Sequence, residues 1–149
     1  MRGQHVIHFT IPAVPIAQPR PRAVVRANGR AGVFGAKASH PVHAFKALAA
    51  LAARQAYRGA PLEGPIEIEV AFVLERPKNR CWKTKPMPRE WHTKKPDADN
   101  LVKSLADALT GILWRDDAQI CVKRLAKYVA AGDEPPHVEV RVREAAGKP

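Results

Sequence analysis

The chain has 149 residues, 46% of them hydrophobic and 26% charged, and 25 Lys and Arg against 14 Asp and Glu give a formal net charge of +11. This suits one compact domain with a sizeable core, residues 1–149. No apolar run approaches the roughly 20 residues that span a bilayer, and the N-terminus does not resemble a secretory signal. Two cysteines without metal-type spacing indicate reduced thiols, so we expect a cytoplasmic protein.

The first half of the chain predicts a strand, a loop, a helix and a second strand. Residues 5–11 alternate apolar and polar side chains, which predicts a short strand. Residues 18–38 have little periodicity and several Pro and Gly, so they predict a long flexible basic loop. Apolar residues at helical spacing predict a helix over 41–58. Ile, Val and Phe alternating with Glu predict a half-buried strand over 66–74.

The second half predicts another basic loop, a helix and two strands. The loop covers about residues 77–95, and a leucine stripe predicts a helix over about 100–112. Residues 118–129 favour a strand, with a change of phase near residue 124 that indicates a bulge. Alternating Val with charged residues predicts a strand over 138–143, and residues after 145 are expected to form a frayed tail.

These elements predict an α+β fold of two layers, with the order β-α-β-α-β-β. The short connection between the last two strands favours a hairpin, and helical connections elsewhere favour parallel pairs. We therefore expect a mixed β-sheet covered by two main helices.

Basic residues are concentrated in the two loops, and the first acidic residue of the chain is Glu63. Such runs are often only a solvated surface. Their position in loops, with Trp82 and Trp91 in the second loop, instead favours nucleic-acid binding, because exposed bases stack on aromatic side chains. The expected DNA-binding residues are Arg20, Arg22, Arg26, Arg30, Lys83, Lys85, Lys94 and Lys95.

Acidic residues are concentrated around the second predicted helix. Asp97 and Asp99 stand at its start, and Asp116 and Asp117 follow its end. One Asp at a helix start is commonly a cap worth about 1 kcal/mol, but two are present. Carboxylates within a basic protein favour a site for Mg²⁺, which takes oxygen ligands. A helix over 100–112 is about 20 Å long, so spacing alone does not bring the two groups together.

Lys103 lies four residues after Asp99 and four before Asp107, on the same predicted helix face. Two surface ion pairs would explain this spacing. A lysine that stabilises negative charge on a phosphate explains it equally well. Asp107 is expected to pair with Lys103, Asn100 to cap the helix, and Trp114 to lie in the core.

The stretch 95–117 resembles the signature of the RusA-type crossover junction endodeoxyribonucleases. The similar features are Asp97-x-Asp99-Asn100, then Lys103, a segment beginning at Asp107, and Trp114 ahead of the acidic pair. About 35 residues match closely, and the rest of the chain agrees in length, basic character and order of elements.

The resemblance implies a small homodimer that resolves Holliday junctions with Mg²⁺, or Mn²⁺, by paired nicks in DNA recombination and repair. It implies Asp97, Asp99 and Asp117 as metal-binding and catalytic acids, with Asp116 as a secondary candidate and Lys103 as the essential lysine. It also implies that the segment after Trp114 folds back, so that Asp117 meets the other two acids. No small-molecule cofactor is expected.

Two alternatives remain open from the sequence. The same metal-nuclease chemistry suits other branched DNA, such as forks and flaps, because selectivity depends on shape. A noncatalytic basic module that binds nucleic acid explains the charge distribution, but it does not explain why the acidic motifs and Lys103 occur together.

Overall fold

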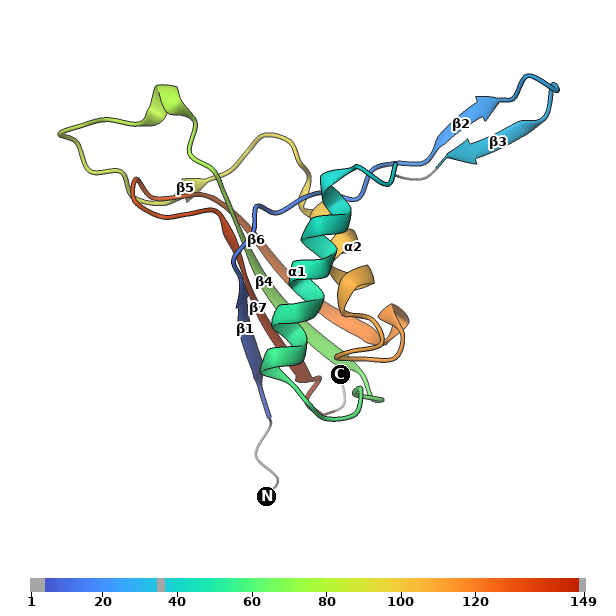
Figure 1. Ribbon diagram of the computed structural model, residues 1–149. Helices are drawn as coiled ribbons and strands as arrows, with labels where there is room; N and C mark the ends of the chain where they lie inside the picture. The colour runs from blue at the N-terminus through green and yellow to red at the C-terminus, as the bar shows by residue number, and fades with distance from the viewer. Residues whose placement is uncertain (1–4, 35–36, 148–149) are drawn as a thin grey trace.

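The computed structural model of the chain describes residues 5–34 and 37–147. Its strands are β1 Ile7–Ile11, β2 Arg22–Val25, β3 Ala31–Phe34, β4 Ile66–Leu74, β5 Glu90–Trp91, β6 Ile120–Val129 and β7 His137–Glu144. Its helices are α1 Pro41–Ala56 and α2 Ala98–Leu109, with short 3-10 turns η1 Lys78–Arg80 and η2 Asp117–Gln119. The fold is α+β, as predicted: α1 and α2 cover one face of a five-stranded mixed sheet (Figure 1).

Alternating side chains build the core between the sheet and the helices. The central strand β4 directs Ile66, Ile68, Val70 and Phe72 toward the helices, and each is at most 2% exposed. Facing them are buried side chains of α1 and α2 at helical spacing, among them Phe45, Ala49, Ala53, Leu101, Leu105 and Leu109. Burying these apolar surfaces is the main favourable term that holds the two layers together.

The sheet is mixed for a different reason from the one predicted. Its order is β1-β7-β4-β6-β5, so β4 lies between β6 and β7, and the expected hairpin of the last two strands is wrong. Strand β4 pairs parallel with β6 and antiparallel with β7. Because its helix-facing side is wholly apolar, β4 is best buried at the centre of the sheet, where both edges are also paired.

The bulge in β6 also lies elsewhere than predicted. Ile66 pairs with Ile120 and Glu67 with Val122, so the extra residue is Cys121 and not a residue near 124. One extra residue moves every following side chain of β6 to the opposite face of the sheet. The alternation of apolar residues along β6 is therefore interrupted in the sequence.

The segment predicted as a flexible loop over 18–38 contains a β-hairpin, formed by β2 and β3 (Figure 1). In its turn, Arg26 N donates to Arg30 O and Gly29 N donates to Arg26 O, and Gly29 has a φ of +76°, which glycine adopts without strain. The hairpin projects away from the sheet and is held by backbone hydrogen bonds, which leave little pattern in the sequence. Residues 35 and 36 of the expected loop lie outside the described residues.

Strand β5 and the turns η1 and η2 were not predicted, and β5 and η1 lie within the segment 77–95 that was expected to be a loop. The core position of Trp114 agrees with prediction. Trp114 is a core residue, 1% exposed, and its indole nitrogen donates to Thr110 Oγ1 at 3.0 Å. The predicted tail is still attached at Ala145, whose N–H donates to Pro65 O at 2.8 Å, while residues 148 and 149 lie outside the described residues. In the described ranges, neither helix has the length and apolar content that crossing a bilayer requires.

Candidate active site

The N-terminal end of α2 carries two acidic side chains that the helix itself does not use. Asp97 is the residue that precedes the first turn, but its side chain makes no capping hydrogen bond, and Asp99 lies in that turn. Both residues are exposed. The capping explanation for these acids therefore fails, although the partial positive charge of the helix terminus still stabilises both carboxylates.

Lys127 holds the backbone immediately ahead of Asp97. From β6, its Nζ donates to Lys94 O and Pro96 O, both at 2.7 Å, and lies 3.5 Å from His92 Nδ1. Burial, and then the charge of Lys127, lower the pKa of His92 below its ordinary value. No sequence pattern predicted this role for Lys127, because the role depends on the end of β6 lying beside the loop.

The face of α2 that carries Lys103 is exposed, as predicted, but its ion pairing differs. Asp107 pairs with Lys46 of α1, 3.5 Å from Nζ to Oδ2, and not with Lys103. The two helices pack side by side, so the neighbour across the helix pair reaches Asp107. Asn100 is not the cap either: it lies within the first turn, and its backbone carbonyl accepts from Gln18 N at 3.0 Å.

The C-terminal end of α2 leads to the other two acids, which have different surroundings. Asp116 caps η2: its Oδ1 accepts from Ala118 N at 2.8 Å, and Gln119 Oε1 accepts from Asp116 N at 2.9 Å. Gln119 also fastens this turn to the chain ahead of β4, through Leu62 O and Gly64 O. Asp117, in the same turn, is exposed.

The two acidic ends of α2 stay apart within one chain. Asp117 lies three residues before the first residue of β6, Ile120, whereas Lys127, which contacts Pro96, lies seven residues beyond Ile120. Seven strand residues span roughly 23 Å. No three His, Cys, Asp or Glu side chains within residues 5–34 and 37–147 are close enough to hold a metal ion.

The prediction that Asp117 meets Asp97 and Asp99 in one chain is therefore wrong. Strand β6 does run back along α2, but Asp117 precedes that strand and remains at the far end of the helix. The catalytic roles of the three acids and of Lys103 remain predictions.

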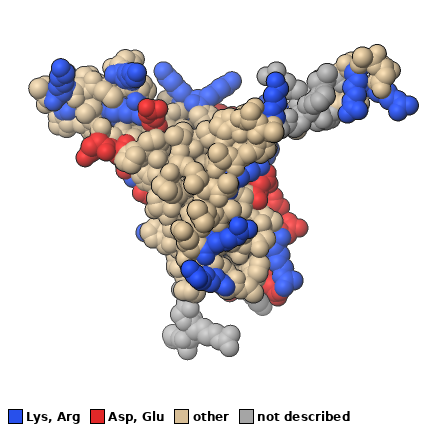
Figure 2. Space-filling view, viewed as in Figure 1, with Lys and Arg blue, Asp and Glu red and all other residues tan. Residues whose placement is uncertain are grey.

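Basic side chains gather on the two projections of the molecule. Figure 2 shows Lys and Arg over the loop that carries η1, at the upper left, and over the β2–β3 hairpin, at the upper right. Among the predicted DNA-binding residues, those with exposed side chains are Arg20, Arg26, Arg30, Lys83, Lys85, Lys94 and Lys95. The Arg22 side chain lies outside what the structure describes. Such paired basic projections suit a large polyanion.

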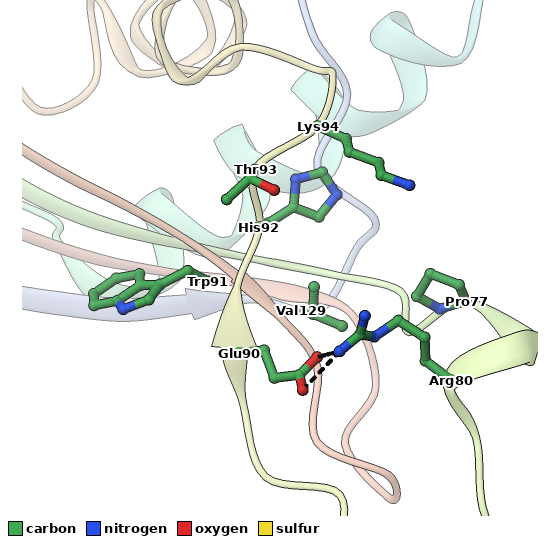
Figure 3. A pocket seen from close by; sticks show the side chains of 8 residues that line it. All are labelled: Pro77, Arg80, Glu90, Trp91, His92, Thr93, Lys94 and Val129. Carbon is green, nitrogen blue, oxygen red and sulfur yellow. Dashed lines mark hydrogen bonds and ion pairs between the residues drawn. The ribbon is translucent and has the colours of Figure 1, made fainter.

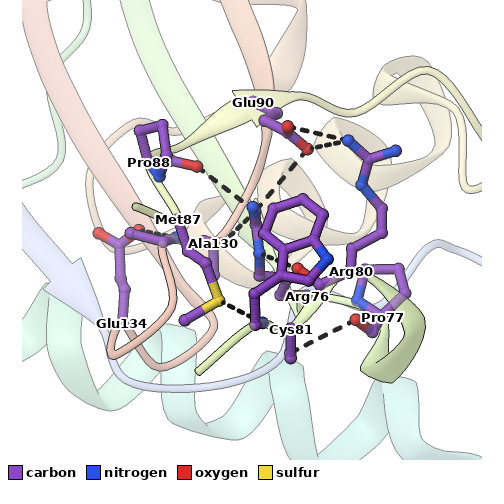
Figure 4. A network of polar contacts seen from close by, with 11 residues as sticks. Arg76, Pro77, Arg80, Cys81, Met87, Pro88, Glu90, Ala130 and Glu134 are labelled. Atoms are coloured by element: carbon purple, nitrogen blue, oxygen red, sulfur yellow. Dashed lines mark hydrogen bonds and ion pairs between the residues drawn. The ribbon is translucent and has the colours of Figure 1, made fainter. Parts of the chain in front are cut away.

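Arg76 is one basic residue that does not face solvent. It is 6% exposed, and it donates to Arg80 O at 2.9 Å and to Ala130 O at 3.3 Å (Figure 4). Its guanidinium carbon lies 5.5 Å from the centre of the Trp82 ring. Arg76 therefore organises the second basic loop from within, a role that its place in a basic run concealed.

These features define a basic protein with an exposed pair of carboxylates at a helix N-terminus, and comparison with known proteins gives its class, an endodeoxyribonuclease. Residues 12–143 match the family model described as Endodeoxyribonuclease RusA. Because the match covers most of the chain, the chain belongs to the RusA family.

Two similar proteins extend the comparison. An uncharacterized protein of Bacillus subtilis (strain 168), YqaN, is 33% identical over 144 residues, which cover 93% of this chain and 96% of that protein. A protein of Lactococcus phage r1t, named crossover junction endodeoxyribonuclease rusA, is 35% identical over 82 residues, which cover 54% of this chain and 55% of the phage protein.

Proposed function

We propose that the chain is a Mg²⁺-dependent endonuclease that resolves four-way DNA junctions by paired nicks, as a homodimer, in recombination and repair. Membership of the RusA family and the name of the phage relative support this activity. The observation that carries it is the pair of exposed carboxylates, Asp97 and Asp99, which α2 does not use for capping.

The chemistry of the carboxylate pair fits Mg²⁺. This ion usually takes one or two carboxylates and fills its remaining positions with water and substrate phosphate oxygens, and Mn²⁺ accepts the same ligands. When bound, the ion lowers the pKa of a coordinated water and withdraws charge from the phosphate. Asp97 and Asp99 would hold it, while Lys103, one turn along α2, would add positive potential where the phosphate gains negative charge.

The third acid, Asp117, reaches such a site from a second copy of the chain. A two-fold dimer that sets the C-terminal end of one α2 beside the N-terminal end of the other forms two equal sites. The separation of the two acidic ends within one chain, roughly the 23 Å that seven residues of β6 span, supports this arrangement. A four-way junction also has approximate two-fold symmetry, so each site meets one of two equivalent strands.

A synthetic four-way junction tests the proposal. Incubated with Mg²⁺, the protein is expected to nick two strands of like polarity at symmetric positions, and a chelator is expected to stop the reaction. Faster nicking of forks or flaps than of junctions would assign the same chemistry to another branched DNA. Tight binding with no nicking in Mg²⁺ or Mn²⁺ would contradict the proposal and favour a noncatalytic DNA-binding protein.

A further inference from the structure

Trp91 is the most exposed aromatic side chain among the large hydrophobic residues of the described ranges. It lies on β5, the edge strand of the sheet, and is 71% exposed, whereas Trp114 is 1% exposed. Its ring stacks on Tyr128 of β6, with centroids 5.1 Å apart and planes inclined by 22°. One stacked neighbour covers only one face of an indole ring, so a flat aromatic surface faces solvent.

The Tyr128 ring also contacts a cationic side chain. The guanidinium carbon of Arg89 lies 5.3 Å from the centre of the Tyr128 ring. Arg89 is fixed in turn by Glu134, at 2.6 Å, and by Glu139, at 3.0 Å. Trp91 and Arg89 therefore both pack on the Tyr128 ring, and ion pairs hold Arg89 in place. A stack that is already ordered loses little conformational freedom when a ligand adds to it.

Trp82, the other exposed tryptophan of the basic loop, is differently placed. It is 39% exposed, and cationic groups of Arg76 and Lys85 lie 5.5 Å and 5.9 Å from its ring centre. Its ring is therefore engaged within the loop, and it stabilises the loop rather than offering an open face. Of the two tryptophans with a predicted base-stacking role, Trp91 is the more exposed, 71% against 39% for Trp82.

Trp91 and Glu90 help to line a cavity at this edge of the sheet. It has a volume of about 390 Å³, and Arg80, His92, Thr93 and Lys94 contribute to its lining (Figure 3). In Figure 3 the Trp91 ring points away from His92 and Lys94, so Trp91 and these two residues lie at different parts of the cavity lining. Arg80 already binds Glu90 through two bonds of 2.8 and 2.7 Å, whereas Lys94 has no ion pair within the described ranges.

We propose that the β5 edge binds an unpaired segment of one DNA strand at the branch point, with an exposed base stacked on Trp91 and a backbone phosphate of the same strand held by Lys94. This rests on the proposed function and adds the substrate feature that the protein recognises. Every base offers a flat face, so the contact selects unpaired strands over duplex without requiring a sequence. Asp97 is six residues beyond Trp91, a separation of at most about 22 Å, so the bound segment lies within reach of the carboxylates.

The test compares DNA binding by Trp91→Leu and Trp91→Phe with that of the unchanged protein, in chelator so that nothing is cut. The probes are a four-way junction with 2-aminopurine at the crossover and the same base within a linear duplex. Leu keeps the apolar bulk but cannot stack, so Trp91→Leu is expected to weaken junction binding roughly tenfold and to abolish the 2-aminopurine fluorescence change. Trp91→Phe is expected to restore most of both signals, and duplex binding is expected to be unchanged in both variants.

Trp82→Leu is the matched control. It removes an indole from the same basic segment, but this indole already contacts the cationic groups of Arg76 and Lys85. It is expected to leave the crossover signal in place. An unchanged junction affinity in Trp91→Leu, or an equal loss on linear duplex, would overturn the inference. A shift from dimer to monomer in sedimentation of Trp91→Leu would also overturn it, because Trp91 would then contact a second copy of the chain.

The two proposals fail separately. If the unchanged protein nicks junctions and Trp91→Leu binds them normally, the nuclease proposal holds and only the stacking role of Trp91 is contradicted. Absence of nicking by the unchanged protein would instead contradict the proposed function.

Discussion

The two ends of α2 both carry acidic side chains, but the surroundings of those acids differ. At the N-terminal end, Asp97 and Asp99 are exposed, and Lys127 fixes the backbone ahead of them. At the C-terminal end, Asp116 is used to cap η2 and Asp117 alone remains exposed. One end thus presents two available carboxylates and the other presents one.

This difference indicates how a three-carboxylate site is assembled. Each end is anchored to the sheet, one through Lys127 on β6 and the other through the bonds of Gln119 to the chain before β4. Bringing the ends together within one chain would break the pairing of β6 with β4, which runs from Ile66 to Leu74. Association of two chains leaves that pairing intact, and this is the physical reason for preferring it.

The largest expected effect comes from removing a carboxylate at either end. Asp97→Asn or Asp117→Asn is expected to reduce nicking by more than the roughly 10- to 100-fold that loss of a group merely supporting a metal ligand costs. Junction binding, measured in chelator, is expected to persist or tighten, because a charge that repels phosphate is lost. Asp116→Asn is the control at the neighbouring position, since Asn caps as well as Asp and nicking should survive.

Mixing the two inactive variants sharpens the comparison of the two ends. In a mixed dimer of Asp97→Asn and Asp117→Asn chains, sites shared between chains are not equal. One centre keeps all three carboxylates, and the other lacks both Asp97 and Asp117. Nicking of a single strand is therefore expected to return on mixing. If the mixed dimers form but stay inactive while the unchanged protein nicks, the shared arrangement is wrong although the nuclease assignment holds.

A smaller effect is expected from the hairpin that projects beyond the N-terminal end of α2. Replacing Arg20, Arg22, Arg26 and Arg30 with Ala is expected to weaken junction binding and to flatten its salt dependence. Each lost phosphate contact reduces the slope of log K against log salt by about 0.9, so the change approaches three to four units if all four contact phosphate. Titrations at several salt concentrations measure it, and an unchanged slope would exclude the hairpin from the DNA-binding surface.

The smallest effect concerns Lys127, which supports the N-terminal end. Lys127→Met is expected to lower the nicking rate several-fold and the stability by about 1 kcal/mol, because two backbone carbonyls lose their donor. It is also expected to raise the pKa of His92, since a nearby positive charge is removed. An NMR titration of His92 measures this shift, and an unmoved titration would contradict the contact.

The same histidine sets a pH dependence whose sign follows from its lowered pKa. In the unfolded chain His92 takes up a proton near pH 6.5, and in the folded protein it does so only at lower pH. The unfolded state therefore binds more protons between those two values, and stability falls as the pH drops through that window. Denaturant unfolding at a series of pH values is expected to show this fall, and Lys127→Met is expected to reduce it.

The sequence by itself determined the two-layer α+β fold, because the periods of apolar residues in β4, β7, α1 and α2 are strong. It also determined the motif of Asp97, Asp99 and Lys103 and the basic character of both loops. The RusA family that this motif indicated is the family to which the chain belongs. These properties are local, because each depends on residues that are close together in the sequence.

Only the tertiary structure decided the relations between distant segments. It placed β4 between β6 and β7 and paired Asp107 with Lys46. It also buried Arg76 and stacked Trp91 on Tyr128. It also kept Asp117 at the opposite end of α2 from Asp97, because the acid precedes the strand that runs back. Such contacts depend on which strands become neighbours, and burial of the whole core selects that arrangement, which no short stretch of sequence specifies.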